Sequence, residues 1–170
     1  MKKGFLVLLA SAFFSFGYQA KAQSMEDLKK HYLSVFQHAL KYNDADVAIN
    51  ALNGYLSITE DVRYKDTLSM LYAQANKIPS SILLSTELYT ADPKNIGALA
   101  RLASGYQALG NSKESLKYYE QLCAVSKEPA FFYQMGVQQF MLKRFGECEQ
   151  TLTKVLSDTG SKKIAVVVPA

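Results

Sequence analysis

The chain has 170 residues, of which 49% are hydrophobic and 20% charged, with 9 Gly, 4 Pro and 2 Cys. That length allows one ordinary domain, and the apolar fraction excludes wholesale disorder and linker-dominated chains. Two cysteines exclude a disulfide-stapled scaffold and any four-cysteine zinc site. The formal net charge of +4 is small, so composition alone points to an ordinary globular protein.

The first 22 residues have the pattern of a secretory signal peptide. Lys2 and Lys3 precede an uncharged apolar run over residues 4–17, and Ala20 and Ala22 supply the small residues of a cleavage site. The alternative is a membrane anchor, but the run is shorter than the roughly 20 residues that cross a bilayer. We therefore predict cleavage after Ala22 and export to the periplasm or out of the cell, with no membrane span in the remaining chain.

Three of the lysines belong to this leading segment, so the rest of the chain is close to neutral. It contains no basic stripe that would attract a phosphate backbone. No nucleic-acid partner is therefore expected.

Residues 23–158 have a helical pattern. Apolar residues recur at spacings of three and four, as at Leu28, Tyr32, Val35 and Ala39, and no sustained alternating stretch is present. Turn-forming residues interrupt the pattern about every dozen residues, as at Asn43-Asp44 and Asp92-Pro93. Short helices joined by short turns form antiparallel hairpins.

Three of these hairpins repeat, at steps of 34 and 33 residues. Corresponding positions are Leu68, Leu102 and Met135, then Ser69, Ala103 and Gly136 in the first helices, and Ser81, Ser115 and Cys148 in the second helices. The expected turns correspond too, at Asn76-Lys77, Gly110-Asn111 and Lys143-Arg144. A non-repetitive helical bundle with fortuitous spacing is the alternative.

This pattern resembles the tetratricopeptide repeat, a helix-turn-helix of 34 residues with small residues where its two helices meet. Residues 133–148 match best, and Asp92-Pro93 resembles the dipeptide that ends a repeat. The resemblance implies an all-α solenoid over residues 23–158, built from three to four stacked hairpins. Their approximate bounds are 25–61, 62–95, 96–128 and 129–158, and the first hairpin is the most degenerate, with Ala48 and Leu52 as its expected second-helix positions.

Members of this family bind proteins or peptides in a concave groove lined by the first helices. Carried over by register, the groove candidates are Tyr32, Arg63, Asp66, Met70, Gln74, Ser104, Gln107, Tyr133 and Val137. The same register places Gly97, Ala100, Ala108 and Ala130 in the groove. The Lys and Asn that clamp a terminal carboxylate in chaperone-docking members are absent, so acidic C-terminal tails are not expected ligands. The register places Phe36, Phe140 and Met141 in the groove as well, but they are better explained as core residues, because apolar residues at helical spacing are usually buried.

Nothing in the sequence indicates chemistry. Phosphate-binding, zinc-protease, nucleophile-elbow and C-x-x-C motifs are all missing. His31 and His38 lie seven apart, whereas metal-binding pairs on helices are usually three or four apart. We therefore predict no enzyme, cofactor or metal, and we expect Cys123 and Cys148 to be two mostly buried thiols, because parallel second helices separate them.

The predicted function is a non-enzymatic interaction scaffold of the bacterial envelope that holds a protein or peptide in its groove. Residues 159–170 leave no room for a capping helix, and their Ile-Ala-Val-Val-Val run could begin a further hairpin. Two alternatives therefore stay open. One is a repeat module of a larger envelope protein or enzyme, and the other is a structural protein that self-associates through its C-terminal end.

Overall fold

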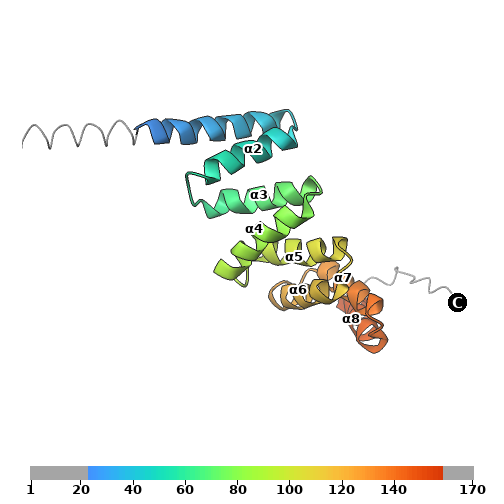
Figure 1. The fold of residues 1–170 in the computed structure, drawn as a ribbon. Helices are drawn as coiled ribbons and strands as arrows, with labels where there is room; N and C mark the ends of the chain where they lie inside the picture. The colour runs from blue at the N-terminus through green and yellow to red at the C-terminus, as the bar shows by residue number, and fades with distance from the viewer. Residues whose placement is uncertain (1–22, 159–170) are drawn as a thin grey trace, which may run out of the picture. The chain divides into compact units, whose positions relative to one another are not determined.

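The computed structural model describes residues 23–158, which form helices joined by short turns, with no strand in that range (Figure 1). The all-helical prediction is confirmed. The predicted signal peptide over residues 1–22 and the tail over residues 159–170 lie outside the described residues. The chain divides into two compact units within one helix, between Lys65 and Asp66.

The first unit contains a helix over residues 23–41, the helix α2 (Ala45–Leu56) and the first turn of α3 (Val62–Gln74). Ala48 and Leu52 of α2 are completely buried, as predicted, and Phe36 is 6% exposed, which confirms that it is a core residue. The ring of Tyr64 meets the rings of both Phe36 and Tyr55 edge-on, at centroid distances of 6.0 and 5.0 Å. Aromatic packing of this kind favours edge-to-face geometry.

The second unit continues α3 and adds five helices in sequence. They are α4 (Ile78–Ala91), α5 (Ile96–Ala108), α6 (Ser112–Val125), α7 (Pro129–Met141) and α8 (Phe145–Asp158). Each of α5 to α8 packs on the helix before it, so that hairpins stack along the chain (Figure 1).

Every turn inside a hairpin has the same backbone conformation. The residue two positions before the second helix adopts a positive φ: 54° at Asn43, 56° at Asn76, 72° at Gly110 and 60° at Lys143. The next residue donates its N–H to the carbonyl five residues earlier, as from Asn111 to Tyr106 at 2.9 Å. This is the Schellman arrangement, which satisfies carbonyls left free at a helix end.

Side-chain caps then start two of the second helices, α2 and α6. Asn111 Oδ1 accepts a hydrogen bond from the N–H of Glu114 at 3.2 Å, and Asp44 Oδ1 accepts from Val47 at 3.1 Å. Between hairpins, Asn95 caps α5 in the same manner, and Pro129 occupies the first turn of α7, where its missing N–H costs nothing. The local sequence therefore determines where these helices begin.

Within a hairpin, the two helices approach at the predicted small residues. Ser81 Oγ donates to the carbonyl of Ser69 at 2.9 Å, and Ser115 Oγ donates to the carbonyl of Ala103 at 2.8 Å. In the hairpin of α7 and α8, a Cβ placed on Gly136 would lie only 2.7 Å from Leu152 Cδ2, so a larger side chain would force the helices apart. Small side chains at these positions are thus a requirement of the packing.

The central core lies between α5 and α6. Leu99, Leu102 and Leu122 are 0% exposed, and Phe131 and Met135 of α7 pack against this cluster. Tyr118 stacks on Tyr106 at 5.7 Å with nearly parallel planes. The hairpin of α5 and α6 therefore depends on α7 of the next hairpin to cover its apolar side, as expected for a repeat protein.

Candidate binding groove

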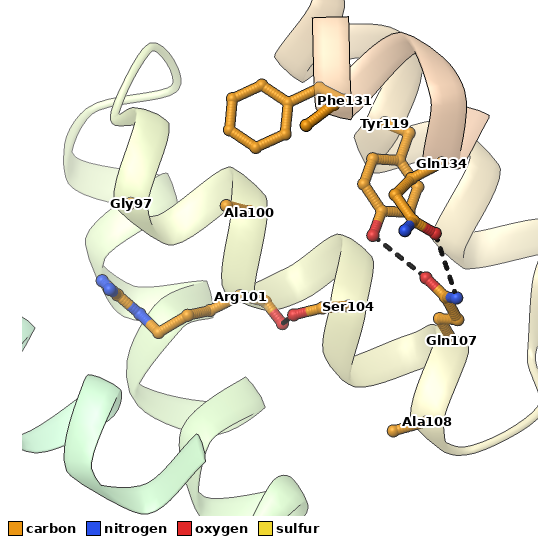
Figure 2. Close-up of a pocket in the computed structure, with 10 residues that line it drawn as sticks. Gly97, Ala100, Arg101, Ser104, Gln107, Ala108, Tyr119, Phe131 and Gln134 are labelled. Carbon is orange, nitrogen blue, oxygen red and sulfur yellow. Dashed lines mark hydrogen bonds between the residues drawn. The ribbon is translucent and has the colours of Figure 1, made fainter. Parts of the chain in front are cut away.

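A hollow of about 590 Å³ lies where α5, α6 and α7 meet (Figure 2). Ten residues line it: Gly97, Ala100, Arg101, Ser104, Gln107, Ala108, Tyr119, Ala130, Phe131 and Gln134. Its volume is within the range of small-ligand and side-chain pockets. We call this space the α5–α7 hollow.

Small side chains create the α5–α7 hollow. Gly97, Ala100, Ser104 and Ala108 repeat at spacings of three and four along α5, so they form one face of that helix. Ala130 continues this small surface on α7, and the ring of Phe131 forms a wall. The register had predicted all five of these small residues in the groove.

Two glutamines form the polar side of the hollow. Tyr119 Oη donates to Gln107 Oε1 at 3.0 Å, and Gln107 Nε2 donates to Gln134 Oε1 at 3.3 Å (Figure 2). Tyr119 is 5% exposed, and its burial raises the pKa of its phenol above the usual value. The phenol is therefore a neutral hydrogen-bond donor at physiological pH.

Arg101 is the one cation among the residues that line the hollow, and it is neutralised. Its guanidinium forms an ion pair with Asp66 of α3 and donates from Nε to Ser85 Oγ at 3.3 Å. Figure 2 shows the side chain extending away from Phe131 and from the two glutamines. The hollow consequently presents polar groups without a free positive charge.

Next to the hollow, α7 carries exposed apolar side chains. Tyr133 is 54% exposed, Phe140 59% and Met141 64%, and Phe145 at the start of α8 meets the Phe140 ring at 5.6 Å. Ala130, Tyr133, Gln134, Val137 and Met141 follow spacings of three, four and seven, so they share one face of α7. We call Tyr133, Val137, Phe140, Met141 and Phe145 the aromatic strip, and the strip and the hollow together the groove.

The expectation that Phe140 and Met141 belong to the core is wrong. Both belong to the last turn of α7, where no described helix covers them, whereas Phe36 in the first unit meets Tyr64. Helical spacing reports that a residue lies on an apolar face, but the neighbouring element determines whether that face is buried.

The other groove candidates have varied environments. Met70 is 41% exposed and Gln74 is exposed on α3, while Asp66 holds Arg101. In the first unit, Arg63 pairs with Asp61 at 3.1 Å, and Tyr32 is half-buried with its ring against Gly54. Ser104 and Gln107 line the hollow itself.

Four lining residues were not predicted: Arg101, Tyr119, Phe131 and Gln134. The repeat register considers only five positions of each first helix, and none of the four occupies one. Tyr119 belongs to the second helix α6, whereas the register places groove residues on first helices. The sequence signal that could have found Gln134 is its place one turn after Ala130, on the same helix face.

Both cysteines are free and buried, as predicted. Burial raises the pKa of the Cys123 thiol to about 11. Within residues 23–158, no cluster of three or more His, Cys, Asp or Glu side chains could hold a metal ion. The helices in this range are also too short or too polar to span a bilayer.

Several solved structures share this fold. A crystal structure of MamA superposes with a TM-score of 0.70 at 13% identity, over 98% of this chain and 93% of that chain. A MamA structure designated AMB-1 gives a TM-score of 0.69 at 17% identity, over 89% and 95% of the two chains. A tetratricopeptide repeat protein from Parabacteroides merdae ATCC 43184 gives 0.70 at 20% identity, over 83% of this chain and 56% of its own length.

The chain therefore has a tetratricopeptide-like repeat fold, as the sequence pattern predicted, and the alternative of a non-repetitive bundle is wrong. No protein-family model and no curated protein matches the sequence. Identities this low establish architecture but not activity, because unrelated functions use the same fold.

Proposed function

We propose that the protein is an exported, non-enzymatic scaffold that holds a protein or peptide in its groove. The observation that carries this proposal is the aromatic strip beside the α5–α7 hollow. Exposed Tyr, Phe and Met side chains are favoured at protein interfaces, and an apolar patch with polar neighbours marks a contact surface. An extended ligand would contact Tyr133 and Phe140 while one of its side chains enters the hollow.

The proposal includes that the residues of the hollow do not act as catalytic acids or bases. The ionisable groups that line the hollow are Arg101 and Tyr119. The first is held in an ion pair, and burial shifts the pKa of the second away from neutrality. A general acid or base needs a pKa near the working pH, so neither residue suits acid–base catalysis.

Export rests on the leader pattern of residues 1–22. A scaffold that begins at Gln23 would act in the periplasm or outside the cell. N-terminal sequencing of the protein recovered from the native host tests this directly. A retained leader would contradict it.

The binding proposal is tested by crosslinking in cells followed by co-purification of the C-terminally tagged chain. We expect one dominant partner that is lost when Tyr133→Glu places a charge on the aromatic strip and Met70→Glu places one on α3, at an exposed position that the repeat register also predicted to face the ligand. The matched control is Leu83→Glu, because Leu83 is also apolar, is 62% exposed and lies on the second helix α4. Equal loss of the partner in the control, or recovery of the protein alone, would contradict the proposal.

Self-association is the second candidate, and one observation favours it. Phe132 and Val155 are half-buried, whereas the residues at the same repeat positions, Leu99 and Leu122, are 0% exposed. A hollow of about 250 Å³ adjoins them, lined by Lys127, Pro129, Phe132, Lys154 and Val155. Analytical ultracentrifugation should then show oligomers that Phe132→Glu dissociates, and a monomer at all concentrations would rule this candidate out.

A further inference from the structure

The hydrogen bonds in the α5–α7 hollow run in one direction. The phenol of Tyr119 is a donor to Gln107 Oε1, which leaves Gln107 Nε2 facing Gln134 Oε1. Both ends of the Gln107 carboxamide are therefore engaged, and its orientation is set by Tyr119. Such chains polarise each bond along the series.

Gln134 ends this series with a donor. Its Oε1 is occupied by Gln107, and among the described residues its Nε2 donates to none. Gln134 is half-buried and lines the hollow. The free group at the wall is thus an N–H pair, which requires an acceptor oxygen from any ligand that covers it.

The hollow also offers no free charge that could pair with a charged ligand. The side chain of Arg101 is 13% exposed, and its guanidinium is engaged by Asp66 and Ser85. The rest of the lining is Gly, Ala and Ser with the Phe131 ring. A buried charge without a partner loses its hydration and gains little in return.

Resting on the proposed function, we propose that the hollow binds an uncharged peptide segment, with a main-chain carbonyl accepting from Gln134 Nε2 and an adjacent apolar side chain packed on Phe131. Tyr119 acts as a positioning residue, because it orients Gln107 and through it Gln134. The aromatic strip then contacts the flanking part of the same segment. Cationic segments, which add a donor where an acceptor is needed, are disfavoured.

Three matched probes test the ligand chemistry against the full chain by NMR titration. They are N-acetyl-L-phenylalanine N-methylamide, which is neutral, N-acetyl-L-phenylalanine, which carries a carboxylate, and L-phenylalanine N-methylamide, which carries an ammonium group. We expect the neutral probe to bind at least threefold more tightly than either charged probe and to shift the Gln134 side-chain amide signals. Tighter binding of a charged probe, or no shift at Gln134, would overturn the proposal.

Two variants test the direction of the hydrogen bonds. Gln134→Glu replaces the donor by an acceptor and should weaken the neutral probe at least tenfold. Tyr119→Phe frees Gln107 and should weaken it about threefold to tenfold, while moving the Gln107 and Gln134 side-chain signals in the free protein. Unchanged binding in either variant would sink the assigned role of that residue.

The chain offers a matched control for the lost phenol. Tyr89 Oη donates to Gln121 Oε1 at 2.8 Å between α4 and α6, and neither residue lines the hollow. Tyr89→Phe should therefore leave probe binding unchanged. If Tyr89→Phe weakens binding as much as Tyr119→Phe, the effect is one of stability and the positioning role is wrong.

The same variants distinguish the ligand chemistry of the hollow from the scaffold function. A cellular partner that depends on Tyr133 but tolerates both Tyr119→Phe and Gln134→Glu would retain the scaffold function and refute the ligand chemistry. Loss of the partner in Gln134→Glu, with retention in Tyr89→Phe, would support both.

Discussion

The turn at Gly110 allows the cost of one backbone conformation to be isolated. Gly110 has a φ of +72°, and a Cβ added there would meet no atom within 4 Å. Gly110→Ala therefore creates no clash with its surroundings, and only the backbone conformation is penalised. An L-residue in the left-handed region costs about 1–2 kcal/mol.

Part of that cost is offset in the unfolded chain. Alanine has less conformational freedom than glycine before folding, which returns about 0.4–1 kcal/mol. The net expectation is a destabilisation of about 1 kcal/mol, read as a lower urea midpoint by far-UV circular dichroism. In a domain of this size, the same change lowers the Tm by roughly 3–5 °C.

Gly146 supplies the control. It lies in the first turn of α8 with an ordinary helical φ, and a Cβ there also meets nothing within 4 Å. Gly146→Ala should raise stability by up to about 1 kcal/mol, because alanine is the better helix former. The reasoning is refuted if both substitutions shift the urea midpoint in the same direction.

Three further results are expected. Burial raises the pKa of the Cys123 thiol from 9.0 to about 11, so with rising pH the thiol loses its proton in the unfolded chain before it does so in the folded one. The free energy of unfolding should therefore fall by up to about 2 kcal/mol between pH 9 and 11. Urea midpoints that fall as much with pH in Cys123→Ala as in the wild type would contradict this. Ser115→Ala removes the buried bond to the Ala103 carbonyl and should cost about 1 kcal/mol, whereas a midpoint equal to that of the wild type would show that the bond contributes nothing. Phe140→Asp at the 59% exposed position should change the free energy of unfolding by less than about 0.5 kcal/mol while weakening partner capture, and a large loss of stability would mean that the strip is structural.

The repeat pattern determined the architecture because its constraints are local. Small residues at Ser69, Ala103 and Gly136 let two helices approach, and a left-handed turn at Gly110 or Lys143 reverses the chain. Each of these requirements involves residues within one hairpin, so spacing along the sequence is enough to identify them. The same register also predicted the small residues of the hollow.

Contacts between different hairpins determine which charges and hydrogen-bonding groups the groove presents. Asp66 neutralises Arg101 from 35 residues away, and Gln107 meets Gln134 across 27 residues. Nothing in the spacing of one helix reports which way such side chains turn, since a long flexible side chain follows its partner.

Burial at the end of the stack was decided in the same way. Phe140 and Met141 have the spacing of core residues, yet both are exposed because no described helix covers them. The sequence by itself determined the helices, their turns and the faces they present. Only the tertiary structure decided which of those faces stay open, because burial and charge pairing depend on neighbours that the chain brings together from a distance.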